Sequence, residues 1–138
     1  MIPKYRAWYV LAEEMINEIL MISFVRKEII GKFSDGSTSV PLKFEDERNG
    51  EDVILMQSTG LKDKNGKEIF EGDILACKTD DEVINLNIFW DEEYALFMFE
   101  SKKYNEQEPL AELVEDNIYP FEIIGNIYEN REILEDKE

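Results

Sequence analysis

Short apolar runs alternate with polar, turn-forming segments along most of the chain. In the second half the runs are rich in β-branched and aromatic residues, and dipeptides such as Thr59-Gly60 and Asn65-Gly66 separate them. This pattern is typical of strands joined by tight turns. A helical turn is expected at 110–114, because Pro109 is well suited to a helix start. We expect strands over residues 40–44, 53–57, 74–78, 83–90, 94–99 and 121–128. The pattern predicts a mainly β (β-rich α+β) protein with a small, strongly bent barrel in its second half.

Residues 8–30 fit two local structures. Apolar residues from Trp8 to Leu20 follow a helical i, i+3, i+4 rhythm, and residues 21–25 are apolar and β-forming. One interpretation is a short helix that leads into a strand. The other is a β-hairpin with Glu13 and Glu14 near its turn. The N-terminal segment is therefore strand-rich, with one helix as an open alternative.

The polar stretch from Glu45 to Asp52 is the best candidate for a linker, since it contains Asn49-Gly50. It divides the chain into an N-terminal β-rich segment, 1–52, and a C-terminal part, 53–138.

Four glycines are expected to be structural. Gly60, Gly66 and Gly72 fall where the chain must turn and can take positive φ without a Cβ clash, while Gly125 suggests a bulge or bend in the last strand. The segment that starts at Asp63 is not a calcium loop, because its glycine falls at position 4 rather than 6. A turn role is therefore favoured over a ligand role.

Composition excludes many enzyme classes. The chain has no histidine and a single cysteine, Cys77, which rules out histidine-based triads and dyads, the usual zinc sites and an intrachain disulfide. We expect no catalytic, cofactor-binding or metal-binding residues, and a buried, inert Cys77. The N-terminus does not resemble a signal peptide and no long apolar segment is present, so a cytoplasmic protein is expected.

The charge is strongly acidic and uneven. The chain carries 15 Lys+Arg against 32 Asp+Glu, a net charge of −17. Residues 1–70 hold 12 acidic and 10 basic side chains, whereas residues 71–138 hold 20 and 5. Such a field disfavours nucleic acids and anionic membranes and suits a basic partner. The candidate partner-binding residues are two clusters at opposite ends of one predicted strand, namely Asp80, Asp81, Glu82, Asp91, Glu92 and Glu93.

Three motifs resemble those of the YopX family of phage and prophage proteins. They read KYRAW at 4–8, MQSTGLKDKNGKEIFEGDI at 56–74 and EIIGNIYEN at 122–130, in the family's order. The resemblance implies a β-rich fold with a C-terminal SH3-like barrel, and it favours strands within 8–30. It supplies no catalytic residue, since no biochemical activity is established for the family.

These observations predict a non-enzymatic protein-interaction module that binds a host or phage protein in the bacterial cytoplasm. One alternative is an acidic nucleic-acid mimic that acts on a basic host protein. Another is an enzyme with a weak carboxylate metal site. A basic island at Lys62, Lys64 and Lys67 could pair with the acidic half of a neighbouring copy, which permits a homo-oligomer.

Overall fold

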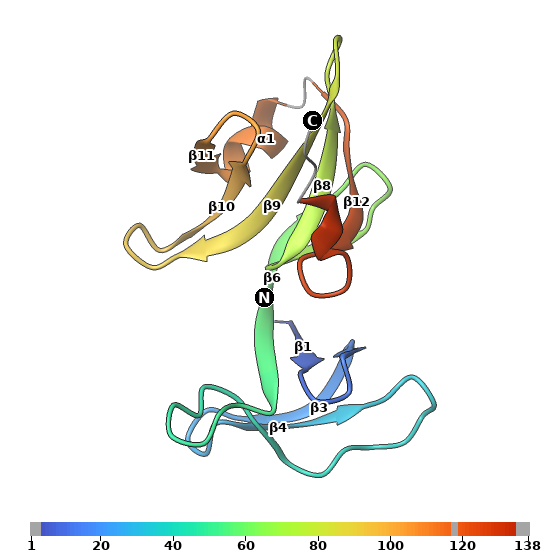
Figure 1. Ribbon diagram of the computed structural model, residues 1–138, viewed down its shortest axis with the longest axis vertical. Helices are drawn as coiled ribbons and strands as arrows, with labels where there is room; N and C mark the ends of the chain where they lie inside the picture. The colour runs from blue at the N-terminus through green and yellow to red at the C-terminus, as the bar shows by residue number, and fades with distance from the viewer. Residues whose placement is uncertain (1–3, 117–118, 135–138) are drawn as a thin grey trace. The chain divides into compact units, whose positions relative to one another are not determined.

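The computed structural model describes residues 4–116 and 119–134, and the chain divides into two compact units. Unit 1 is Met1–Gln57 and unit 2 is Ser58–Glu138. Within the described residues the protein is mainly β, with three antiparallel sheets and one short α-helix (Figure 1). Each unit has its own cluster of buried apolar side chains. The predicted boundary lies in the 45–52 stretch, whereas the units meet inside a strand, after Gln57.

Unit 1 is built from short strands around a small core. Its strands are β1 (Tyr5–Tyr9), β2 (Glu14–Ile16), β3 (Glu18–Ser23), β4 (Glu28–Lys32), β5 (Leu42–Lys43) and the first half of β6 (Val53–Lys62). β1 pairs with both β2 and β6, and β4 lies between β3 and β5. The core contains Ala7, Ile16, Ile29, Leu42, Phe44 and Val53.

The helix proposed for the N-terminal segment is wrong, and the hairpin alternative is confirmed. β1 and β2 form an antiparallel pair, and Glu13 in the connecting turn has φ of 52°. The helical rhythm was misleading because Leu11, one of its apolar positions, lies in the turn and is 85% exposed. Trp8 and Ile16 bury their side chains from neighbouring strands instead of from one helix face.

Unit 2 is a five-stranded antiparallel sheet with a helix against it. Its elements are the second half of β6, β7 (Glu68–Phe70), β8 (Asp73–Lys78), β9 (Val83–Asp91), β10 (Leu96–Ser101), β11 (Glu106–Pro109), α1 (Leu110–Asp116), β12 (Phe121–Asn126) and the 3-10 turn Arg131–Ile133. The sheet has the order β11-β10-β9-β8-β12, and α1 lies against β10 and β11 (Figure 1). The core contains Ile69, Leu75, Cys77, Leu86, Ile88, Leu110 and Phe121.

The predicted C-terminal SH3-like barrel is not what the structure shows. In the described part of unit 2 the sheet is open, with β11 and β12 at its two ends. The chain leaves β11 through Pro109, which has no N–H to donate to a further strand, and enters α1 directly. Leu110, Leu113 and Val114 then cover the sheet from the helix, as their i, i+3, i+4 spacing predicted. The sheet that forms a half-barrel is instead the N-terminal one, which contains β1 and has the strand order β2-β1-β6-β7.

Most strand predictions of the second half are confirmed within a few residues. The long strand expected at 83–90 is β9, and it forms the expected hairpin with β10. The last strand is β12, and its pairing with β8 shifts register between Ile123 and Gly125, which is the bulge expected there. β11 was missed, because its sequence Glu-Gln-Glu-Pro carries no apolar signal.

Candidate functional site

The two acidic clusters lie at opposite ends of β9, as the sequence indicated. Asp80, Asp81 and Glu82 belong to the β8–β9 connection, and Asp91 to Glu93 begin the β9–β10 connection. β9 has nine residues and therefore spans roughly 30 Å, so the clusters form two separate surfaces.

A tight turn presents the first cluster. The Thr79 backbone N–H donates to the Glu82 carbonyl over 2.8 Å, and the Thr79 hydroxyl accepts from the Glu82 N–H over 3.2 Å. Asp80 and Asp81, at the tip of this turn, are exposed. The turn therefore holds Glu82 in a fixed position and leaves the other two carboxylates in solvent.

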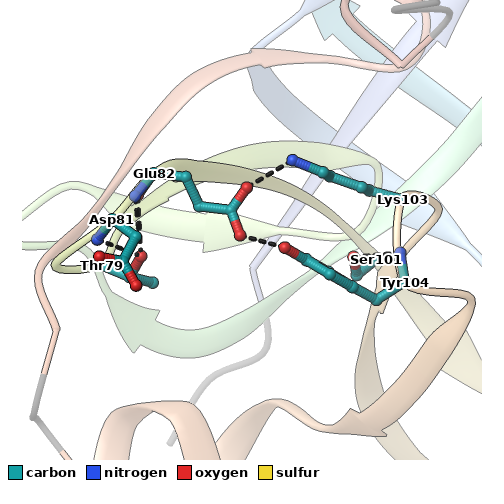
Figure 2. Close-up of polar contacts among 6 residues, drawn as sticks. All are labelled: Thr79, Asp81, Glu82, Ser101, Lys103 and Tyr104. Carbon is teal, nitrogen blue, oxygen red and sulfur yellow. Dashed lines mark hydrogen bonds and ion pairs between the residues drawn. The ribbon is translucent and has the colours of Figure 1, made fainter. Parts of the chain in front are cut away.

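Glu82 joins the β8–β9 turn to the β10–β11 turn. One carboxylate oxygen accepts a hydrogen bond from Lys103 Nζ and the other accepts one from the Tyr104 hydroxyl (Figure 2). We call these three residues the clasp. The backbone of Tyr104 is held in place by a 3.2 Å hydrogen bond that its N–H donates to the Ser101 hydroxyl.

The clasp changes the acidity of two of its members. The hydrogen bond from Lys103, together with that from Tyr104 and the lysine's charge, holds the pKa of Glu82 below its ordinary value. The bond that Tyr104 donates to Glu82, with partial desolvation and the nearby negative charge, raises the pKa of the Tyr104 hydroxyl. At neutral pH the clasp is thus a carboxylate held by two donors.

An apolar cavity of about 200 Å³ lies beside the clasp. It is lined by Cys77, Thr79, Ile84, Leu86, Phe99, Ser101, Tyr104, Glu106, Glu108, Leu113 and Tyr119, from the sheet, from α1 and from the residues that precede β12. Cys77 is nearly fully buried, and burial raises the pKa of its thiol. The cavity therefore has a buried, unreactive interior and an exposed rim.

The second cluster lies among exposed aromatic residues. The Asp91 carboxylate caps the turn by accepting from the Glu93 and Tyr94 N–H groups over 2.9 and 3.1 Å. Trp90 is 40% exposed and packs edge-on against Phe97, with ring centroids 5.0 Å apart. Tyr94 is 66% exposed. We call residues 90–96 the hairpin end.

The six predicted acidic residues thus divide by role. Glu82 and Asp91 make hydrogen bonds that fix their turns, while Asp80, Asp81, Glu92 and Glu93 are exposed to solvent. Only the last four present their carboxylates fully to a partner. Sequence reasoning missed Lys103 and Tyr104, which lie 21 and 22 residues from Glu82 and gave no local signal.

Among the predicted turn glycines, three have left-handed backbone conformations. Gly60, Gly66 and Gly72 have φ of 81°, 81° and 86°. Gly125 is required for another reason, since a Cβ there would lie 2.5 Å from Asn130 Oδ1.

Asp63, in the segment considered as a cation loop, is a structural hub. Its carboxylate accepts from the Asn65 and Lys67 N–H groups of its own turn and from the Ile123 N–H of β12, over 2.8–3.0 Å. Burial works to raise the pKa of Asp63, but these three donors and the charge of Lys67 outweigh it and lower the pKa. All of its short contacts are to backbone donors, so the turn interpretation accounts for this residue. The sequence signal was the Asp-x-Asn-Gly pattern of an Asx turn.

In the described ranges, no group of three or more Asp, Glu or Cys side chains is arranged to hold a metal ion. None of the helices there has the length and apolar character needed to cross a membrane.

The comparisons with known proteins give one family model and two similar solved structures. A sequence model of the family described as YopX protein matches residues 4–135. Protein EF1440 from Enterococcus faecalis is 29% identical, with a TM-score of 0.62 over 97% of this chain and 99% of that chain. Protein yopX from Bacillus subtilis is 20% identical, with a TM-score of 0.62 over 94% and 96%, and shows the fold alone. No curated protein matches the chain significantly.

Proposed function

The chain belongs to the YopX family, and from that premise we propose that it is a non-enzymatic protein-interaction module. Its partner is a basic host or phage protein, and the setting is the cytoplasm of a bacterial host. The observation that carries the proposal is the hairpin end, where exposed aromatic rings lie among exposed carboxylates.

The hairpin end has the composition of a binding surface. Exposed Trp90 and Tyr94 supply large apolar area at low entropic cost, and these two residue types are enriched among the residues that dominate interface energies. Trp90 is held by its contact with Phe97, so its orientation is fixed before binding. Single exposed apolar residues are ordinary, but a group of them on one turn indicates a contact site.

The charge of unit 2 indicates what kind of partner fits. Residues 58–138 carry 22 acidic and 8 basic side chains, whereas residues 1–57 carry 10 and 7. A surface with a net charge of −14 attracts basic proteins and repels phosphate backbones. The field therefore favours a protein with a basic patch.

No observation favours the two alternatives. A nucleic-acid mimic needs closely spaced negative charges, whereas here two clusters lie at opposite ends of β9 and Lys103 neutralises Glu82. A metal-dependent enzyme has no support from the described carboxylates, since no three of them are arranged to hold a metal ion. Both remain predictions from composition.

Affinity capture from a bacterial lysate tests the proposal. We expect the unaltered chain to retain a basic protein, and the Tyr94→Ser variant to lose most of it because an exposed aromatic anchor is removed. Leu11→Ser is the matched control, since Leu11 is also highly exposed but lies in unit 1. Equal capture by all three proteins, or capture of nothing together with turnover of a small molecule, would contradict the proposal.

A further inference from the structure

We propose that the apolar cavity beside the clasp receives one apolar side chain from a basic segment of the partner. This inference rests on the proposed function and adds a second contact, at the other end of β9 from the hairpin end. It concerns the space between Cys77, which is buried, and the rim residues Tyr104, Glu106 and Glu108, which are exposed.

The size of the cavity selects a single side chain. An apolar cavity of about 150 Å³ can bind benzene, whereas sites for drug-sized ligands and cofactors run from about 300 Å³ upwards. At about 200 Å³, the cavity fits an isobutyl or benzyl group and little more. The atoms that it exposes are apolar, and Ile84, Leu86 and Leu113 are among the contributing side chains.

The charge of the rim selects the flanking residues. Glu106 and Glu108 line the cavity from β11, the outermost strand of the sheet, and Asp80 and Asp81 are exposed on the β8–β9 turn. Lysine or arginine on either side of the inserted residue would meet these carboxylates. A symmetric contact with a second copy through β11 would instead bring acidic residues against acidic residues, because Glu106 and Glu108 would face their own counterparts.

The clasp gives the rim a defined shape. Tyr104 belongs both to the clasp and to the cavity lining, so its bond to Glu82 fixes the ring at the rim (Figure 2). Lys103 is paired with the same carboxylate, so its charge opposes a basic ligand less than an unpaired lysine would. The rim is therefore preorganised for an incoming side chain.

Two peptides test the proposal on the intact chain with labelled methyl groups. One has a leucine between two pairs of lysines, and the other has serine in place of leucine. We expect the leucine peptide to shift the methyl signals of Ile84, Leu86 and Leu113. The serine peptide should bind roughly tenfold more weakly or worse, because the burial of a leucine side chain is lost.

Two charge variants test the rim. Glu106→Gln combined with Glu108→Gln should weaken binding of the leucine peptide severalfold. Glu13→Gln combined with Glu47→Gln makes the same change of charge at two exposed residues of unit 1 and should leave these methyl shifts unaltered. N-acetylleucine amide, which has the side chain without the lysines, should bind more weakly than the peptide.

Several results would overturn the proposal. Equal binding of the leucine and serine peptides would show that the cavity is not used. Equal binding of N-acetylleucine amide and the leucine peptide would make the site one for small apolar molecules, and cavity shifts that grow with protein concentration alone would indicate a second copy. Methyl shifts confined to Leu96 would end the cavity proposal and leave the hairpin end, and with it the proposed function, intact.

Discussion

At the scale of single residues, two buried carboxylates stabilise turns of this fold by accepting backbone hydrogen bonds. Asp63 and Asp73 are both buried and both accept backbone N–H groups, Asp73 from Phe70 over 2.8 Å. Asp63 also ties its own turn to β12, sixty residues away. These carboxylates act as acceptors for turns whose backbone donors would otherwise be unsatisfied.

Replacing Asp63 with asparagine tests this role. The amide oxygen can still accept from the turn, but the amide nitrogen would face the Ile123 N–H, so a buried donor loses its acceptor. We expect a loss of about 1–3 kcal/mol in the free energy of unfolding, measured with urea at pH 7. Asp35→Asn is the control, because Asp35 caps an exposed turn, and it should cost only a few tenths of a kcal/mol.

The same residue predicts a pH dependence. Since folding lowers the pKa of Asp63, its contribution is present above the unfolded value of about 3.9 and is lost as pH falls through the folded pKa. The stability gap between the unaltered protein and Asp63→Asn should therefore narrow in acid. A gap that stays constant down to pH 2 would show that the charge of Asp63 is not involved.

The clasp predicts a second titration. Folding raises the pKa of Tyr104, so the stability that this group contributes is present below the ordinary value near 10 and is lost as pH rises through the folded pKa. In a carbon-13 NMR titration of the tyrosine rings, Tyr104 should ionise above the ordinary tyrosine value near 10. Glu82→Gln should lower the Tyr104 midpoint, and an unchanged midpoint would show that the clasp does not form in solution.

Sequence reasoning was reliable where a residue acts through its neighbours in the chain and failed where it acts across the fold. The turn role of Gly60, Gly66 and Gly72 is a local feature, and the sequence indicated it. The partners of Glu82 come from another turn, so no spacing rule could connect Lys103 and Tyr104 with it. The cavity lining also comes from five separate stretches of chain, which only the folded sheet brings together.

At the scale of elements, the second half of the chain followed its apolar pattern and the first half did not. β9 and β10 are long and apolar enough for their strands to be predicted from the sequence. β1 and β2 are so short that their apolar residues fit a helical spacing as well as a strand alternation. The barrel prediction failed at β11, a polar edge strand that ends at proline. A sheet closes into a barrel only if its two edge strands pair with each other. The polar sequence of an edge strand such as β11 gives no pattern from which that pairing can be predicted.

The bulge in β12 gives a prediction at this scale. A methyl group at Gly125 would lie 2.5–2.9 Å from three atoms of the Asn130 side chain, whose oxygen accepts the Asn126 N–H. We expect Gly125→Ala to cost about 1–3 kcal/mol in the free energy of unfolding, because Asn130 must be displaced. Ile124→Ala alters the adjacent, partly exposed residue and should cost less. If both variants unfold at the same denaturant concentration, Gly125 does not hold the bulge.

At the scale of the whole molecule, the two units differ strongly in net charge. Unit 2 carries most of the net charge of −17, and such self-repulsion destabilises a compact state. Raising salt from about 0.01 M to about 0.15 M shortens the Debye length from about 30 Å to about 8 Å. We expect the melting temperature to rise by about 4 °C for each kcal/mol of repulsion that is screened. A melting temperature that falls with added salt would mean that ion pairs outweigh the repulsion.

The central claim is that an acidic, aromatic surface on unit 2 binds a basic partner protein. The most direct test is the dissociation constant for the captured partner, measured at two salt concentrations for the unaltered chain, Tyr94→Ser and Leu11→Ser. Loss of an aromatic anchor worth about 2 kcal/mol weakens binding roughly thirtyfold, so Tyr94→Ser should bind that much more weakly while Leu11→Ser binds normally. Higher salt should weaken binding of the unaltered chain. Equal constants for all three proteins, insensitive to salt, would contradict the claim.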